Sequence, residues 1–338
     1  MIYNENDSVR LSQDGSSVVI IDQTLLPAEK RFISLSAAEE IFDAIYHLKV
    51  RGAPAIGIFA GYALYVLARQ ISETEDFFAR LEDLSDYLNS SRPTAVNLSW
   101  ALNRVKKAAL NCRNLKRSEI LNAMRTEAAV IHEEDTAVCR KIAEYGLSLI
   151  NDGDGILTHC NAGALATSRY GTGLGPLLYG AEQGYRFHAF IDETRPLMQG
   201  ARLTAFELMN AGIDCTLICD NAAGLLMSQG KIQACFAGCD RAAMNGDCAN
   251  KIGTASAAVL ANYYKIPFYI FCPSSTIDKN CRTGKDIVIE ERPAEEITKL
   301  YFSRQIAPDG IKCFNPAFDV TDHSLITAII TENGIFRL

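Results

Sequence analysis

The sequence has few of the features expected of a protein that binds nucleic acid, zinc or a membrane. Its formal net charge is −7, so it has no overall positive charge with which to bind a phosphate backbone. Its 5 histidines are scattered without zinc-ligand spacing, and it contains neither a Walker A nor a GxGxxG sequence. The first residues have no apolar signal core, and the uncharged stretch from Gly52 to Ala68 is short for a membrane span. We therefore expect a cytoplasmic protein with no nucleic-acid, membrane or metal partner.

Disulfides are also not expected. The 11 cysteines are odd in number and include no CxxC pair. Several of them lie in apolar runs, which is typical of buried free thiols in a reducing compartment. With 338 residues, of which 48% are hydrophobic, the chain is long enough for about two domains and needs no covalent staple.

The first half, residues 1–150, is predicted to be mostly helical with a small β-element. Asp14-Gly15 separates two apolar segments, which indicates a hairpin whose second strand is Val18–Ile21. A helix is expected to open at Ser36, with Glu39 closing a capping box. Further helices are predicted at 55–71, 76–89, 95–110 and 117–149.

The second half, residues 151–338, alternates short apolar runs with helical stretches. This alternation predicts βαβ units, and hence a Rossmann-like parallel sheet flanked by helices. The fold class is therefore α/β, with a separate helical domain before the sheet. The predicted strands are 155–159, 187–191, 216–219, 234–237 and 268–271, and the predicted helices include 203–210, 222–228 and 254–264.

Polar residues follow each predicted strand. In an open parallel sheet, ligands bind beyond the carboxyl ends of the strands, so these residues are expected to converge on one site. The alternative is that loops are polar anyway, but that accounts less well for a thiol, several carboxylates and two guanidinium groups together. The clusters are Cys160-Asn161, Asp192 to Arg195, Asp220-Asn221, Asp240-Arg241 and Pro273 to Ser275.

Two of these residues are candidates for catalysis. Cys160 precedes a small-residue turn, and a following helix would lower the pKa of its thiol. Asp240 follows an apolar run, and desolvation there would raise the pKa of its carboxyl and suit it to general acid catalysis. The alternatives are a buried structural cysteine and a surface pair of Asp240 with Arg241, the latter nearly as well supported. His159 is interpreted as an inert strand residue.

Three cations near predicted helix starts are candidate phosphate contacts. Arg51 opens the turn Arg51-Gly52-Ala53-Pro54, Arg92 precedes Pro93, and Asn250-Lys251 precedes a helix near residue 254. A cation beside a helix N-terminus can form an anion site. Taken singly, each is better explained as a solvated charge at a helix end.

Several stretches of the sequence resemble methylthioribose-1-phosphate isomerases. They occur in the order found in that family and cover nearly the whole chain. The stretches are VRGAPAIG (50–57), RPTAVNL (92–98), ILTHCNAGALAT (156–167), DETRPLMQGARLTAFEL (192–208), GCDRAAMNGDCANKIGT (238–254), PFYIFCPSSTID (267–278) and NPAFDVT (315–321).

The resemblance implies an aldose–ketose isomerase of methionine salvage that forms a homodimer and shares its fold with regulatory subunits of a translation initiation factor. It implies that Asp240 is the proton donor and that Cys160 assists the transition state. Substrate contacts would fall on Arg51, Gly52, Ala53, Arg92, Gln199, Asn250 and Lys251.

A sugar with phosphate on its anomeric carbon cannot open by simple ring–chain exchange, so the enzyme must protonate the ring oxygen. Hydrogen then moves from C2 to C1, either as a proton through an enediol with Cys160 as base, or directly as a hydride. A water-poor site favours the hydride route. Neither route requires a metal or an organic cofactor.

The sequence departs from the family pattern at Cys239, where alanine is expected, and between Ser168 and Pro176. These differences leave the 5-substituent of the sugar open: 5-deoxyribose 1-phosphate would need the same catalytic pair, and ribose 1,5-bisphosphate would need another cation. A general isomerase of open-chain sugar phosphates is a further alternative. The alternative from another class is a translation-factor-like binding subunit, against which the presence of both Cys160 and Asp240 argues.

Overall fold

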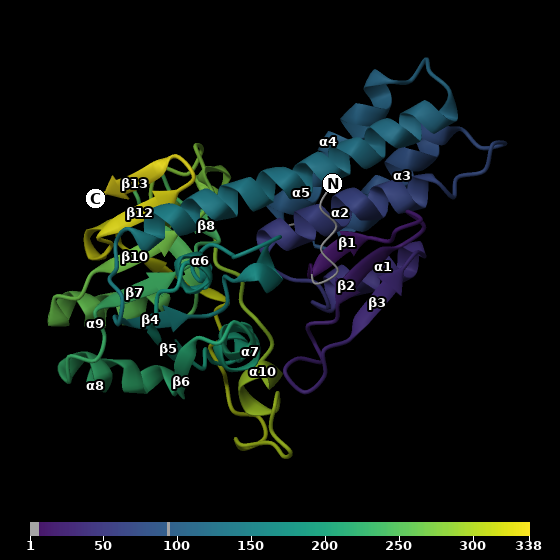
Figure 1. Ribbon diagram of the computed structural model, residues 1–338. Helices are drawn as coiled ribbons and strands as arrows, with labels where there is room; N and C mark the ends of the chain where they lie inside the picture. Colours follow the sequence, from purple (N-terminus) through teal and green to yellow (C-terminus); the bar gives the residue numbers. More distant parts are fainter. Residues whose placement is uncertain (1–6, 93–94) are drawn as a thin grey trace. The chain divides into compact units, whose positions relative to one another are not determined.

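The chain divides into two compact units. The computed structural model describes residues 7–92 and 95–338. Unit 1 comprises Met1–Ala137 and Ala164–Arg169, and unit 2 comprises Val138–Gly163 and Tyr170–Leu338 (Figure 1). The division falls within the long helix α5 (Arg117–Leu147), which contributes its first part to unit 1 and its last part to unit 2.

Unit 1 begins with a three-stranded antiparallel sheet. Its strands, in the order β1-β2-β3, are β1 (Val9–Leu11), β2 (Val18–Ile21) and β3 (Phe32–Leu35). The turn between β1 and β2 contains Gly15 at φ +70°, and the Asp14 carboxylate accepts the backbone N–H of Ser16 at 3.0 Å. The predicted hairpin and its second strand are confirmed.

Helices make up the rest of unit 1. They are α1 (Ala38–Tyr46), α2 (Ala53–Ala68), α3 (Phe77–Ser90), α4 (Val96–Asn111) and the first part of α5. The predicted capping box of α1 is wrong by one residue. Glu40, rather than Glu39, reaches back to the backbone N–H groups of Ser36 and Ala37. The N-cap is Ala37, which has no side-chain oxygen to offer the helix.

Helix α2 is the centre of the unit 1 core. It is buried on every face from Ala55 to Ala68, because its uncharged sequence presents apolar side chains all round. Phe59 and Leu64 are fully buried in the same cluster as Leu98 and Leu102 of α4. No helix in the described part of the chain is both long and apolar enough to cross a membrane.

Unit 2 is built on a seven-stranded sheet with the order β13-β12-β10-β7-β4-β5-β6. All neighbouring strands are parallel except β12 and β13. The strands are β4 (Gly155–His159), β5 (His188–Asp192), β6 (Asp214–Ile218), β7 (Ala234–Ala237), β10 (Phe268–Phe271), β12 (Ala328–Thr331) and β13 (Gly334–Arg337). The predicted parallel sheet is therefore confirmed, with three of its five predicted strands residue for residue.

Helices cover both faces of this sheet (Figure 1). Neighbouring residues of β4 point to opposite faces, so Leu157 and Ile156 belong to different apolar clusters. The Leu157 cluster includes residues of α8 (Ala223–Ser228) and α9 (Thr254–Tyr264). The Ile156 cluster includes residues of α6 (Gly175–Glu182), α7 (Ala205–Asn210) and the end of α5.

Shorter elements connect these layers, and the sequence pattern predicts none of the strands among them. A small antiparallel sheet of order β11-β9-β8 consists of β8 (Arg241–Ala242), β9 (Cys248–Lys251) and β11 (Phe318–Thr321). The others are α10 (Glu295–Thr298), a π-helical turn η2 (Gly200–Thr204), and the 3-10 turns η1 (Ala164–Ala166), η3 (Asp220–Ala222), η4 (Ser274–Thr276), η5 (Gly284–Asp286) and η6 (His323–Leu325). None of the 11 cysteines forms a disulfide, but only Cys139, Cys235, Cys248, Cys272 and Cys281 are buried, so the prediction of buried thiols holds for these five.

Candidate functional site

The candidate site lies at the carboxyl edge of the seven-stranded sheet in unit 2. Five parallel strands, β4, β5, β6, β7 and β10, end at this edge. The polar residues that end or follow them are Cys160, Asp192, Asp220, Asp240 and Ser274. The topology therefore places these residues at one edge of the sheet.

The two candidate catalytic residues follow neighbouring strands. β4 and β7 pair in register, with His159 opposite Ala237. Cys160 comes directly after His159, and Asp240 comes three residues after Ala237. A Cβ atom on Gly238 would lie 2.8 Å from the Cβ of Ala162, so glycine is needed where the loops after β4 and β7 pack together.

The backbone of Cys160 is held on both sides by threonines. Its N–H donates to Oγ1 of Thr194 at 2.9 Å, and its carbonyl accepts from Oγ1 of Thr204 at 2.6 Å. Cys160 has φ +65° and Thr194 has φ +63°, a conformation that is costly for a residue with a Cβ and rare for a β-branched one. Such strained positions concentrate at functional sites.

The helix predicted to follow Cys160 is not there. The next regular element is the three-residue 3-10 turn η1, and the next α-helix, α6, begins only at Gly175. A single 3-10 turn does not sum enough aligned peptide dipoles to act as a helix N-terminus. The expectation that a helix directly lowers the pKa of this thiol is therefore wrong.

Asp240 is exposed rather than buried among apolar side chains. Its backbone N–H donates to the carbonyl of Ala249 at 2.9 Å, which places it at the start of the small sheet and beyond the buried strand β7. The guanidinium of Arg241 turns away to Asp278, with Nε 2.9 Å from Oδ2. The prediction that Asp240 is surrounded by apolar side chains is therefore wrong, because the residue is exposed.

Asn250 and Lys251 lie on β9, just before α9. The amide of buried Asn250 donates to Oγ1 of Thr254 at 3.0 Å. The ammonium of Lys251 donates to the carbonyl of Ala317 at 2.9 Å and lies 4.3 Å from the centre of the Phe318 ring. Both side chains are therefore held by residues around the small sheet.

The N-terminus of α9 is already occupied by a carboxylate of the chain itself. Asp319 accepts the backbone N–H of Gly253 at 2.7 Å and that of Ala255 at 3.1 Å. Burial raises the pKa of Asp319, although these two hydrogen bonds act in the opposite direction. The predicted anion site beside Lys251 would therefore have to form without these amides.

Gln199 is buried directly before the π-helical turn η2. Its Oε1 accepts no hydrogen bond from any described residue. A Cβ on the next residue, Gly200, would lie 1.7 Å from the carbonyl oxygen of Asp192, so this turn packs directly on the end of β5. An unpaired buried amide oxygen at the sheet edge is consistent with a substrate contact.

The remaining candidate residues belong to unit 1. Arg51, Gly52 and Ala53 form the start of α2, where Gly52 is the N-cap. Gly52 has φ +90°, and a Cβ there would lie 2.4 Å from the carbonyl oxygen of Ala166. Arg92 is half-buried, and the two residues that follow it, Pro93 and Thr94, lie outside the described residues.

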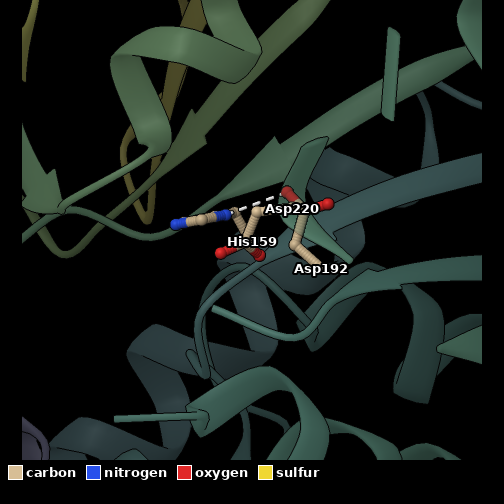
Figure 2. Close-up of side chains that lie close together, drawn as sticks. All are labelled: His159, Asp192 and Asp220. Atoms are coloured by element: carbon tan, nitrogen blue, oxygen red, sulfur yellow. Dashed lines mark hydrogen bonds and ion pairs between the residues drawn. The ribbon is translucent and has the colours of Figure 1, made fainter. Parts of the chain in front are cut away.

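His159, interpreted from the sequence as inert, lies in a polar cluster with Asp192 and Asp220 (Figure 2). Its Nδ1 is 2.9 Å from Oδ2 of Asp192, and its Nε2 is 2.9 Å from the carbonyl oxygen of Ile252. Both side chains of the His159–Asp192 pair are only 2% exposed. The sequence contains one signal for this cluster: a histidine stands at the last position of a buried strand, and acidic residues stand at the ends of the next two strands.

The same cluster is the place to look for a metal. His159, Asp192 and Asp220 offer ligand atoms that all lie within 4.8 Å of one another. However, 2.9 Å between Nδ1 and Oδ2 is a hydrogen-bond distance. The two carboxylate oxygens of Asp220 accept the backbone N–H groups of Thr194 and Arg195 at 2.7 and 2.8 Å. These contacts describe a hydrogen-bonded cluster rather than a set of ligands arranged around an ion.

The sheet makes this an α/β protein, and in open α/β sheets small ligands bind beyond the carboxyl ends of the strands, where the candidate residues lie. The family profile described as "Initiation factor 2 subunit family" matches residues 49–338. The chain belongs to this family.

Individual relatives are similar over nearly the whole chain. A methylthioribose-1-phosphate isomerase of Symbiobacterium thermophilum is 56% identical over 98% of this chain and 93% of its own length. A 5-deoxyribose 1-phosphate isomerase of Clostridium botulinum is 51% identical over 97% of this chain and 94% of its own length. The crystal structure of 5-methylthioribose 1-phosphate isomerase from Pyrococcus horikoshii OT3 matches with a TM-score of 0.92 and 41% identity, over 99% of this chain and 95% of that chain. The resemblance read from the sequence motifs is confirmed.

Proposed function

We propose that this protein is an aldose–ketose isomerase that converts 5-methylthioribose 1-phosphate into 5-methylthioribulose 1-phosphate, a reaction of methionine salvage. The observation that carries the proposal is its 56% identity to a methylthioribose-1-phosphate isomerase over 98% of the chain. The placement of Cys160 and Asp240 after the paired strands β4 and β7 supports it, because one substrate can then meet both groups.

In this proposal Asp240 donates a proton to the ring oxygen of the sugar, and Cys160 assists the transfer of hydrogen from C2 to C1. Because Asp240 is exposed in unit 2, the bound substrate has to help exclude water from it. The backbone of Cys160, held by Thr194 and Thr204, fixes the point from which the thiol side chain extends.

The residues proposed to contact the substrate are Arg51, Gly52, Ala53, Arg92, Gln199, Asn250 and Lys251. Phosphate recognition suits the cationic members of this set, and the open acceptor of Gln199 suits a sugar hydroxyl. We further propose a cytoplasmic homodimer, and light scattering after size-exclusion chromatography measures its mass directly.

Substitution of the two catalytic residues tests the proposal. Cys160→Ala and Asp240→Asn should each lower kcat for methylthioribose 1-phosphate by at least about 100-fold, the usual contribution of a positioned acid or base. Matched controls are Cys219→Ala, an exposed thiol after β6, and Asp152→Asn, an exposed carboxylate before β4; both should keep wild-type activity. Wild-type protein that isomerises no sugar 1-phosphate would favour the binding-subunit alternative.

The route of hydrogen transfer is tested with the same substrate in deuterated water. Transfer through an enediol exposes the moving proton to exchange, whereas a direct hydride shift does not. The half-buried position of Cys160 limits access of water and is consistent with the hydride route. Deuterium at C1 of the product would contradict that route.

A second candidate is isomerisation of 5-deoxyribose 1-phosphate, which is favoured by the 51% identity to the Clostridium botulinum 5-deoxyribose 1-phosphate isomerase. It needs the same chemistry and differs only in the pocket for the 5-substituent. A panel of 5-methylthio, 5-deoxy and 5-phospho sugars, compared by kcat/KM, decides between the candidates. One missing methylene group changes such a ratio by roughly 10- to 200-fold, so the larger methylthio group should change kcat/KM by at least about 10-fold.

A further inference from the structure

The imidazole of His159 is hydrogen-bonded at both nitrogens, and this restricts where its protons can be. Nε2 lies 2.9 Å from the carbonyl oxygen of Ile252, which can only accept. Nε2 must therefore carry a hydrogen in every state that keeps this contact.

The other nitrogen then determines the proton count of the pair. Nδ1 lies 2.9 Å from Oδ2 of Asp192, and neither atom can donate if the ring is neutral and the carboxylate is ionised. One proton has to lie between them, on the ring or on the carboxyl. In both forms the pair has no net charge, which is the form a buried pair tolerates best.

A second proton does not fit. The remaining oxygen of Asp192, Oδ1, is buried and has no hydrogen-bond partner among the described residues. A proton placed there would have no acceptor, and the pair would carry a buried positive charge. The geometry therefore selects the state with one proton.

The charged surroundings favour the same state. The titratable groups that act on the pair are Asp220, Glu193, Asp319 and Cys235. Burial tends to lower the pKa of His159, but its hydrogen bond to Asp192 and the carboxylates of Asp192 and Asp220 outweigh burial and raise it. Burial also raises the pKa of Asp192, against the effect of His159. Because the pKa values of His159 and Asp192 are both raised, the pair keeps its shared proton as the pH rises.

The pair also connects the parts of the proposed site. His159 precedes Cys160, and the backbone carbonyl of Asp192 accepts the hydroxyl of Thr194, which in turn holds Cys160. Ile252 follows Lys251 directly. A Cβ on the next residue, Gly253, would lie 2.6 Å from Cε1 of His159, so the ring packs closely against the turn after β9.

We propose that His159 and Asp192 (Figure 2) form a neutral pair sharing one proton. In this proposal His159 is a positioning residue that holds the turn after Asn250 and Lys251 against the strand end carrying Cys160. Its effect on substrate binding rests on the proposed isomerase function, whereas the shared proton does not. Neither His159 nor Asp192 needs to touch the substrate in this role.

Kinetics of two variants test the positioning role. Asp192→Asn can donate from its amide to Nδ1 of a neutral ring, so the bond from His159 to Ile252 survives. Combining it with His159→Leu removes that bond without leaving a buried carboxylate unpaired. We expect KM to rise less than threefold in the single variant and at least tenfold in the double variant, with a smaller change in kcat.

His188 provides a matched control on the same strand as Asp192. Its ring also makes two hydrogen bonds, to Asp214 at 2.7 Å and to Thr216 at 2.9 Å, but it lies at the opposite end of β5. His188→Leu should leave KM unchanged. A double variant that loses stability but keeps the wild-type KM would show a merely structural role and overturn the positioning role.

Proton linkage tests the shared proton without any substrate. Above pH 6.5 an unfolded chain has neutral histidine and ionised aspartate, whereas the folded pair keeps one proton. The unfolding equilibrium should therefore shift tenfold toward the unfolded state for each pH unit above 6.5, or about 1.4 kcal/mol, until the folded pair loses its proton. Asp192→Asn should remove this slope, as followed by urea unfolding with far-UV circular dichroism.

The shared proton and the positioning role can be refuted separately. Equal pH slopes in wild type and Asp192→Asn would overturn the shared proton, whether or not the protein is an isomerase. One equivalent of metal retained by the purified wild type and lost in Asp192→Asn, measured by elemental analysis, would also overturn it, because the ion would replace the proton. An inactive wild type with the expected slope would refute the proposed function and, with it, the positioning role, but not the pair.

Discussion

Gly52 is a position where adding a single methyl group should lower the free energy of unfolding, because the methyl group would overlap backbone atoms. Its φ of +90° is unfavourable for any residue with a Cβ. A Cβ there would lie 2.4 Å from the carbonyl oxygen and 2.5 Å from the Cα of Ala166. These are backbone atoms, so Gly52→Ala cannot be accommodated by rotating a side chain.

The two components of the cost can be estimated separately. Placing a residue with a Cβ at positive φ lowers the free energy of unfolding by about 1–2 kcal/mol. Forcing packed groups apart costs roughly another 1–3 kcal/mol. Gly15→Ala is the matched control, because Gly15 has φ +70° but its nearest atoms, the Tyr65 hydroxyl at 3.2 Å and the Arg69 Nη1 at 3.3 Å, are the ends of flexible side chains. It should show only the first component.

The assay can be specific for unit 1. The chain has 1 tryptophan, Trp100, which lies on α4 in that unit. Its fluorescence during urea unfolding should give a free energy of unfolding lower by about 2–5 kcal/mol for Gly52→Ala. The loss should exceed that of Gly15→Ala by about 1–3 kcal/mol. Equal losses in the two variants would refute the argument from backbone overlap.

Two further predictions concern Asp319 and His132. Asp319→Ala leaves the N–H groups of Gly253 and Ala255 without their acceptor, and should cost about 1–2 kcal/mol in thermal unfolding; Asp319→Asn, which keeps an acceptor oxygen, should cost less, and equal losses would contradict the capping role. Burial lowers the pKa of His132 to about 4. Unfolding then takes up a proton below pH 6.5, so unit 1 should lose stability as the pH falls from 6.5 toward 4. His132→Gln should remove this loss in urea unfolding followed by Trp100 fluorescence, and an unchanged acid sensitivity would argue against it.

The sequence was informative wherever a segment carries its own pattern. Strands β4, β7 and β10 and helix α9 were predicted to the residue, because continuous apolar runs and small-residue helices are local signals. The direction of the strands followed from their alternation with helices. That inference alone placed Cys160 and Asp240 at one edge of a sheet, since parallel strands all end on the same side.

The surroundings of those residues were decided only by the tertiary structure. The strand β9, which carries Asn250 and Lys251, pairs with nearby β8 on one side and with β11, from far along the chain, on the other. The carboxylate that occupies the start of α9, Asp319, comes from 66 residues away. The exposure of Asp240 likewise depends on where the small sheet lies, and not on the apolar residues before it.

His159 shows the difference most clearly. The sequence determined that a histidine ends a buried strand and that aspartates end or follow its neighbours. Whether that ring is inert, charged or paired depends on atoms contributed by β5 and by the turn after β9. Hydrogen bonds and burial are properties of groups brought together by folding, whereas periodicity belongs to the chain itself. Residue types and strand ends could therefore be read from the sequence, but protonation and exposure could not.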